Sequence, residues 1–195
     1  MVKKLPLANQ QLDLQSMQIL TLCGSLRARS SNRALLRAYE RLAPSVLTFR
    51  HYERLGELPH FNPDLDSGAP PLAVGELRSL VAGADAVVIS TPEYAHALPG
   101  SFKNALDWLV SDPAFAGKPV AILHVARGST WALDSLKEVL KTMSATVIES
   151  ASVLLPLGSN QMDEDAILER DDLRKLLLGS VECLITETTQ KSRPT

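Results

Sequence analysis

The sequence predicts an α/β protein in which a five-stranded parallel sheet lies between two layers of helices. Five apolar runs alternate along the chain with five segments whose apolar residues recur at helical spacing. The runs AVVIS (residues 86–90) and PVAILHV (residues 119–125) are apolar at almost every position, as expected for parallel strands that helices cover on both faces. The chain has 195 residues, 45% hydrophobic and 22% charged, which is typical of one globular domain.

The apolar patterns, and the glycines and prolines between them, place each element along the chain. We expect strands at residues 18–23, 46–51, 86–90, 119–125 and 146–155. We expect helices at residues 32–42, 72–82, 99–110, 131–142 and 166–187. Gly179 should weaken the middle of the last helix. Residues 54–71 are rich in proline, aspartate and glycine, so they predict a long loop after the second strand.

This succession of strands and helices favours the strand order 2-1-3-4-5, with right-handed crossovers. It is the order of a flavodoxin-like three-layer sandwich. In such folds a ligand binds outside the carboxyl ends of the strands, at the switch between the first and third strands. We therefore expect the binding site in the loops after the first, third and fourth strands. Residues 17–190 should form this single domain, preceded by a flexible extension at residues 1–16.

Charge and composition argue against several classes of protein. The formal net charge of −2 gives no sign of nucleic-acid or membrane-surface binding. No run of about 18 apolar residues occurs, so no transmembrane helix is expected. The first 16 residues lack the continuous apolar core of a signal peptide. Two cysteines are too few for a disulfide framework, and we expect Cys23 to be a buried free thiol in a cytoplasmic protein.

The loop after the first strand, CGSLRARSSN (residues 23–32), has chemistry that suits a phosphate group. Its short polar side chains are Ser25, Ser30, Ser31 and Asn32, and its cations are Arg27 and Arg29. Gly24 would let the backbone approach a ligand, and the start of the next helix would offer free N–H groups. The segment matches neither GxxxxGK[ST] nor GxGxxG. The alternative is that its serines and asparagine only cap the helix.

The loop after the third strand, TPEYAHALPG (residues 91–100), brings an aromatic ring and a carboxylate to the switch point. These are Tyr94 and Glu93, in a loop that Pro92 and Pro99 stiffen. The alternative is a structural turn in which Tyr94 covers the core.

Together the two loops resemble the NADPH-dependent FMN reductase family of the flavodoxin-like superfamily. That family carries GSxRxxSxN after its first strand, and the chain matches every fixed position with Gly24, Ser25, Arg27, Ser30 and Asn32. The family also carries TPEYN…PGxLKNAxDW, which is similar to TPEYAHALPGSFKNALDW at residues 91–108. The segment LPHFNPDLD (residues 58–66) resembles the family's loop after strand two, and the resemblance spans residues 17–155.

The resemblance implies FMN as the cofactor and NADPH or NADH as the electron donor. It assigns the FMN phosphate to Ser25, Arg27, Ser30 and Asn32. It assigns the isoalloxazine ring to Pro92, Glu93, Tyr94 and Ala95, with Gly128 in the third loop. The flavin would carry the chemistry, so no catalytic side chain is expected. The family also implies a small-molecule electron acceptor and a homodimer or homotetramer.

The chain departs from the family pattern near the ring. Ala95 stands where the family usually has Asn, and Ala97 stands where Ser is common. The third loop, HVARGSTWALDSL (residues 124–136), keeps Gly128 but carries bulkier residues than the family's GxxGG. We expect Trp131 to be a core residue at a helix start; alternatively it narrows the flavin site or contacts a partner subunit. We expect His124 to be a hydrogen-bonded core residue.

Three functions therefore compete. The favoured one is an FMN-dependent NAD(P)H oxidoreductase that passes hydride through FMN to a quinone, azo compound, metal ion or free flavin. The second is a flavin-binding electron carrier without NAD(P)H activity. The third is a degenerate family member that acts as a binding module, an idea that rests on Ala95, Ala97 and the altered third loop.

Overall fold

The computed structural model describes residues 16–125, 128–157 and 162–191, so the expected extension at residues 1–16 falls outside it apart from Ser16. The strands are β1 (Met17–Cys23), β2 (Leu47–Tyr52), β3 (Ala86–Ser90), β4 (Pro119–Val125), β5 (Thr146–Val147) and β6 (Val153–Leu155). The helices are α1 (Ser31–Leu42), α2 (Leu72–Gly83), α3 (Gly100–Leu109), α4 (Trp131–Thr142), α5 (Glu164–Glu169) and α6 (Asp171–Lys191). Short 3-10 turns lie at Leu55–Glu57, Pro63–Leu65, Pro113–Phe115 and Glu149–Ala151.

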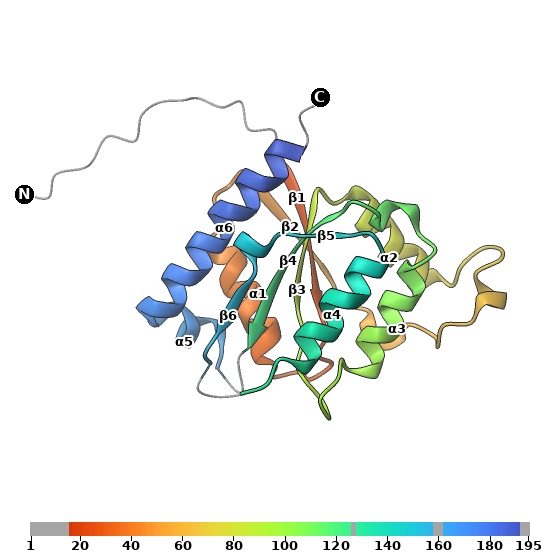
Figure 1. Ribbon diagram of the computed structural model, residues 1–195, viewed down its shortest axis with the longest axis horizontal. Coiled ribbons are helices and arrows are strands. Elements are labelled where there is room, and N and C mark those ends of the chain that lie inside the picture. Colours follow the sequence, from red (N-terminus) through yellow and green to blue (C-terminus); the bar gives the residue numbers. More distant parts are fainter. Residues whose placement is uncertain (1–15, 126–127, 158–161, 192–195) are drawn as a thin grey trace, which may run out of the picture.

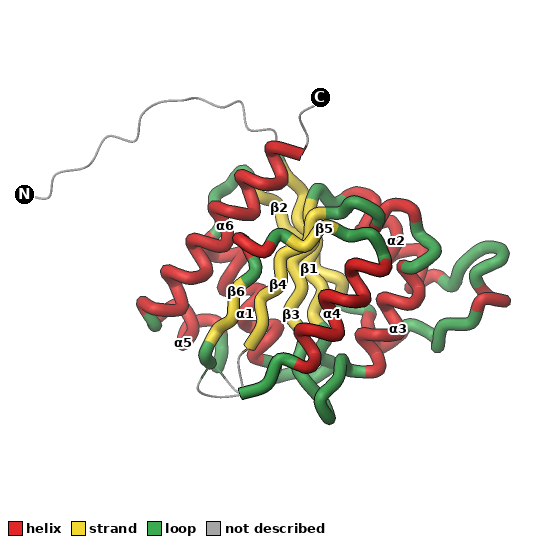
Figure 2. The backbone as a smooth tube through the Cα atoms, viewed as in Figure 1, coloured by secondary structure: helices red, strands yellow, loops and turns green. Residues whose placement is uncertain are grey.

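The strands form a parallel sheet in the order β2-β1-β3-β4-β5, with β6 also pairing with β4 (Figure 2). This confirms the predicted strand order. Every residue of β3 and β4 is buried. Both strands lie inside the sheet with helices above and below, which explains why their sequences are apolar on both faces.

Helices cover both faces of the sheet, which confirms the three-layer sandwich. Figure 1 shows α1, α5 and α6 on one side of the strands and α2, α3 and α4 on the other. The first layer buries Leu35 and Tyr39 against the sheet, and the second buries Phe102, Trp108 and Leu136. Within the described ranges, no helix is both long enough and apolar enough to cross a bilayer.

The expected fifth strand, residues 146–155, is divided in two. β5 pairs with the beginning of β4 and β6 pairs with its end, while the 3-10 turn at Glu149–Ala151 separates them. At the break the hydroxyl of Ser152 accepts a hydrogen bond from Ile122 N at 3.1 Å and donates to Ile148 O at 2.9 Å. A side chain thus takes the place of a strand carbonyl, and the strand pairing resumes beyond it.

The expected last helix, residues 166–187, is also divided, at a place that the sequence did not indicate. Arg170 adopts an extended backbone with ψ of 110° and ends α5, while α6 continues through Gly179 without interruption. The Arg170 guanidinium pairs with Asp172 and donates to Pro156 O at 3.3 Å, which ties the bend to the segment after β6. Gly179 therefore does not break the helix, because packing of one face outweighs its low helix propensity.

The long loop after β2 is held against α3 by side chains of the segment KNALDW (residues 103–108). Asn104 Nδ2 and Trp108 Nε1 both donate to the carbonyl of Pro59, at 2.9 and 2.8 Å. Asn104 Oδ1 accepts from Phe61 N at 2.7 Å. Asn104 and Trp108 therefore position this loop, because their side chains form hydrogen bonds with its backbone.

Candidate functional site

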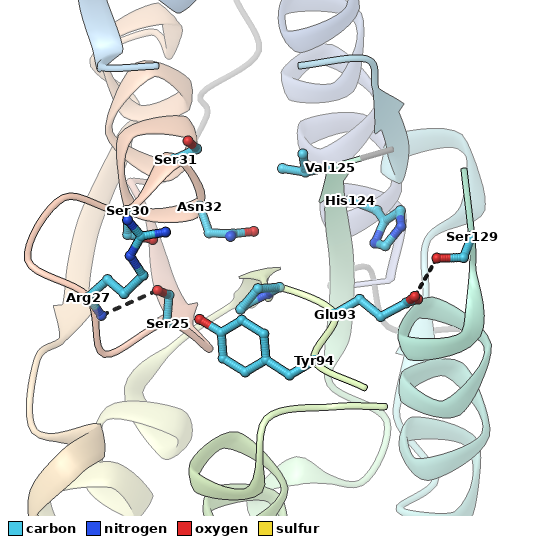
Figure 3. Close-up of a pocket in the computed structure, with 11 residues that line it drawn as sticks. Ser25, Arg27, Ser30, Ser31, Asn32, Glu93, Tyr94, His124, Val125 and Ser129 are labelled. Atoms are coloured by element: carbon cyan, nitrogen blue, oxygen red, sulfur yellow. Dashed lines mark hydrogen bonds between the residues drawn. The ribbon is translucent and has the colours of Figure 1, made fainter. Parts of the chain in front are cut away.

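The loops after β1, β3 and β4 meet at the carboxyl edge of the sheet and enclose one hollow, at the predicted switch point (Figure 3). Its lining residues are Ser25, Arg27, Ser30, Ser31, Asn32, Pro92, Glu93, Tyr94, His124, Val125 and Ser129. Carboxyl ends of parallel strands share one edge, so three loops far apart in sequence form a single site.

Most residues that the family resemblance assigned to FMN lie around this hollow. All four expected phosphate ligands line it, and so do Pro92, Glu93 and Tyr94. Ala95 and Gly128 are adjacent to lining residues but do not line the hollow themselves. The sequence prediction omitted Ser31, His124, Val125 and Ser129; the last three lie at the end of β4 and in the loop after it, which the strand order had already nominated.

Gly24 allows two loops to approach each other closely. A Cβ atom at this position would lie 2.0 Å from Thr91 Oγ1 and 3.1 Å from Thr91 Cα. The Gly24 N–H donates to Ser90 O at 2.9 Å, so the β1 loop is fixed directly against the end of β3. Gly24 therefore has a structural role besides the expected close approach to a ligand, because it lets the loops after β1 and β3 touch.

The serine and asparagine side chains of the β1 loop are buried although they surround a hollow. Ser25 and Asn32 are only 3% and 8% exposed. Ser30 caps α1, but its Oγ lies 3.4 Å from Arg33 N, which is a long hydrogen bond. Asn32 does not cap the helix, because its Oδ1 lies 2.9 Å from Ser90 Oγ, on β3. Capping therefore explains only part of this polar cluster.

The charge around the helix start suits an anion. The first turn of α1 carries no acidic side chain, and the N-terminal end of a helix is positively polarised. Arg27 lines the hollow and has no ion-pair partner among the residues the structure describes. Arg29 instead lines a separate hollow between α1 and the start of α5.

Glu93 connects the β3 loop to α4. Its Oε2 accepts a hydrogen bond from Ala132 N at 3.0 Å, and its Oε1 accepts one from Ser129 Oγ. The Ala132 N–H, with help from the Ser129 hydroxyl, holds the pKa of the Glu93 carboxyl below its ordinary value. Figure 3 shows this carboxylate turned toward Ser129, away from Ser25 and Arg27. Glu93 therefore stays ionised and fixes two walls of the site to each other.

The residues after Glu93 form a tight turn with a left-handed backbone. Tyr94 and Ala97 exchange two backbone hydrogen bonds, each 3.0 Å long. Between them Ala95 has φ of 50° and His96 has φ of 59°. Two consecutive residues with positive φ define a type I′ turn, which favours Asn and Gly. The Asn that the family usually has at position 95 therefore suits the backbone as well as a ligand.

Trp131 is exposed, so the expectation that it belongs to the core is wrong. It begins α4 with 61% of its surface accessible, while Ala132, Leu136 and Leu140 form the buried face of that helix. Its ring meets the His96 ring edge to face, with centroids 6.1 Å apart. Tyr94, which lines the hollow and is 48% exposed, lies two positions before His96, and we call Tyr94, His96 and Trp131 the aromatic group. An aromatic group at this place suits contact with a ligand or with another subunit.

His124 is buried, as expected, although one of its two ring nitrogens has no hydrogen-bond partner within the described ranges. It is 4% exposed and lines the hollow. The nitrogen without a partner there is Nε2, which is itself buried. Cys23, expected to be buried, is a free thiol that is partly exposed.

Comparison with known proteins shows the family to which the chain belongs. Residues 17–160 match the sequence profile described as NADPH-dependent FMN reductase. The chain belongs to this family. Membership implies FMN as the cofactor and NAD(P)H as the electron donor, in agreement with the expectation from the two loops.

Relatives with named activities agree with the family. A quinone reductase of Pseudomonas putida is 40% identical over 119 residues, which are 59% of this chain and 63% of that protein. A 2-hydroxy-1,4-benzoquinone reductase of Burkholderia sp. is 32% identical over 169 residues, or 83% of this chain and 91% of that protein. The flavoenzyme NAD(P)H:(acceptor) oxidoreductase FerB of Paracoccus denitrificans has a similar structure, with a TM-score of 0.72 at 27% identity, over 89% of this chain and 98% of that one.

Proposed function

We propose that the protein is an FMN-dependent oxidoreductase that takes hydride from NAD(P)H and delivers electrons to a small-molecule acceptor, most readily a quinone. One observation carries this proposal: a buried polar loop at the start of α1 and the TPEY loop after β3 line the same hollow at the switch point. The first suits the phosphate of FMN and the second suits its ring.

The β1 loop fits the phosphate end of FMN. Ser25, Ser30 and Asn32 are buried polar side chains that line the hollow, and the first turn of α1 adds backbone N–H groups. Arg27 adds a positive charge that no described carboxylate neutralises. Buried hydroxyl and amide groups around a hollow are stable only if they are hydrogen-bonded, and phosphate oxygens are suitable acceptors.

The β3 loop fits the ring end of FMN. Pro92, Glu93 and Tyr94 line the hollow there, with Ala95 and Gly128 supporting the loops on either side. Bound FMN would supply the chemistry by accepting a hydride and giving up electrons. Glu93 would not exchange protons, because both of its oxygens accept hydrogen bonds from the protein and its pKa is lowered. The protein's contribution is orientation and exclusion of water.

The exposed aromatic group favours a planar aromatic acceptor. Tyr94 lines the hollow, and His96 and Trp131, which are in edge-to-face contact, each lie two positions from a lining residue. Aromatic side chains gain from stacking with another π system, and a quinone provides one. Two relatives are named as quinone reductases. Both observations support a quinone rather than a metal ion as the acceptor.

The same aromatic group also suits contact between subunits. Tyr94 and Trp131 are 48% and 61% exposed, and aromatic residues are enriched at interfaces between proteins. We include a homodimer or homotetramer in the proposal, with the flavin near the boundary between subunits. Both cysteines are free thiols, which supports a reducing compartment, the cytoplasm.

One experiment tests the function and separates it from the alternatives. Purified protein is titrated with FMN, its absorption spectrum is recorded, and the complex is mixed with NADPH or NADH in a stopped-flow instrument. We expect micromolar or tighter binding, bleaching of the flavin band by NAD(P)H, and return of the band when a benzoquinone is added. A flavin that stays oxidised would indicate an electron carrier, and absence of binding would indicate a degenerate binding module.

A further inference from the structure

His124 is a polar residue placed in an otherwise apolar strand. Every residue of β4 is buried, and the neighbours of His124 along the strand are Leu123 and Val125. His124 is nevertheless among the residues that line the cofactor hollow. In Figure 3 it lies on the same side of that hollow as Glu93 and Ser129, across from Ser25 and Arg27.

The carboxylates near His124 already accept hydrogen bonds from other residues. Both oxygens of Glu93 accept hydrogen bonds from Ser129 and Ala132. Asp134 accepts one from Thr130 Oγ1 at 2.9 Å. By contrast, Nε2 of His124 is buried and has no hydrogen-bond partner in residues 16–125, 128–157 and 162–191. Buried polar atoms are almost always paired, so this nitrogen requires an explanation.

The environment fixes which form of the imidazole is present. Burial is the main influence and lowers the pKa of His124, so the ring is neutral at neutral pH. In the tautomer that carries its proton on Nδ1, the neutral ring offers the Nε2 lone pair as an acceptor.

The geometry points to His124 as a cofactor-binding residue whose Nε2 accepts a hydrogen bond from an N–H or hydroxyl group of bound FMN. The inference rests on the proposed function, since it needs FMN in the hollow. FMN offers suitable donors in its ribityl hydroxyls and its ring N–H. The competing explanation is a structural residue that merely fills the end of β4.

Binding measurements on two variants separate these explanations. His124→Leu removes the acceptor, and His124→Gln places an amide near the position of Nε2. We expect the FMN dissociation constant, followed by quenching of flavin fluorescence, to rise about tenfold in the Leu variant and to stay within about threefold in the Gln variant. The matched control is His60→Leu, because His60 is an exposed histidine in the loop after β2. This substitution should leave the FMN dissociation constant unchanged.

Unfolding in urea gives a second readout that does not depend on activity. In full-length protein without flavin, His124→Leu should raise the urea midpoint, because it removes a buried atom that lacks a partner. Saturating FMN should then stabilise the Leu variant less than it stabilises the wild type. A structural role predicts the opposite sign, with a lower midpoint in the flavin-free variant.

The outcomes are distinct. A wild type that binds FMN together with a Leu variant of equal affinity overturns the role of His124 and leaves the proposed function standing. A flavin-free Leu variant with a lower urea midpoint also overturns it. A wild type that does not bind FMN overturns the proposed function, and this inference with it.

Discussion

Glu93 Oε2 accepts a hydrogen bond from the Ala132 N–H at 3.0 Å across 39 positions of sequence. Thr130, which immediately precedes α4, does not cap the backbone N–H groups of that helix, because its hydroxyl donates to the Asp134 carboxylate instead. Glu93 therefore caps α4 from a loop on another strand. Its second oxygen accepts from Ser129, so the loops after β3 and β4 are connected through one carboxylate.

Removing this carboxylate should loosen both loops. We expect Glu93→Ala to lower the free energy of unfolding by about 1 kcal/mol, the usual cost of losing a helix cap. Urea denaturation of the flavin-free protein measures this change in the free energy of unfolding. Glu149→Ala is the control, because Glu149 pairs with Lys137 on the surface and should change the free energy by less than about 0.5 kcal/mol. Equal losses in the two variants would mean that Glu93 does not act as a cap.

The stabilisation by Glu93 should also depend on pH. Its pKa is lowered, first by the Ala132 N–H and then by Ser129, from an ordinary value of 4.5. A carboxyl with a lowered pKa in the folded state contributes stability above its unfolded pKa and loses it as the pH falls through the folded value. The difference in urea midpoint between wild type and Glu93→Gln should be constant from about pH 6 to 8 and shrink below about pH 4.5. A difference that persists undiminished at pH 3 would contradict this.

Ala95 occupies a backbone conformation that suits glycine and asparagine better. With φ of 50° its side chain crowds the backbone, at a cost of roughly 1 kcal/mol. We expect Ala95→Gly to raise the free energy of unfolding by about that amount, and Ala95→Asn to raise it by less. Ala97→Gly is the control and should lower stability, because Ala97 closes the turn outside the left-handed region. Thermal or urea unfolding shows whether each substitution raises or lowers the free energy of unfolding.

The strand order and the two loops could be predicted from sequence because both depend on local patterns. Apolar strands, glycines and prolines mark the elements, and GSLRARSSN and TPEY follow them directly. The division of the fifth strand could not be predicted, because Ser152 takes the place of a strand carbonyl only in contact with Ile122 of β4. That contact joins distant segments and leaves no local signal.

The roles of individual site residues were harder to predict for the same reason. The position of Glu93 at the switch point could be predicted, but its use as a cap for α4 depends on residues far along the chain. Trp131 is exposed because α4 buries Ala132, Leu136 and Leu140. The orientation of a helix about its axis is set by packing, and residues in the first turn are the least constrained by periodicity.

Gly24 should tolerate no side chain. A Cβ atom there would overlap Thr91, whose Oγ1 and Cβ would lie 2.0 and 2.6 Å away. We expect Gly24→Ala to lower the free energy of unfolding by roughly 3 kcal/mol and to weaken FMN binding, since the two loops would separate. Thr91→Gly in the same chain should recover part of the loss. Gly179→Ala, in open space on α6, is the control and should raise stability by roughly 0.5–1 kcal/mol.

The two arginines of the β1 loop should differ in their effect on FMN binding. Arg27 lines the hollow at the switch point, whereas Arg29 lines a separate hollow beside α5. We expect Arg27→Ala to raise the FMN dissociation constant about tenfold, because a charged contact to phosphate is lost, and Arg29→Ala to change it less than about twofold. Fluorescence titration at low and high salt measures both. The Arg27 effect should shrink at high salt, since ions screen an exposed charge. Equal effects of the two substitutions would mean that the phosphate does not lie against Arg27.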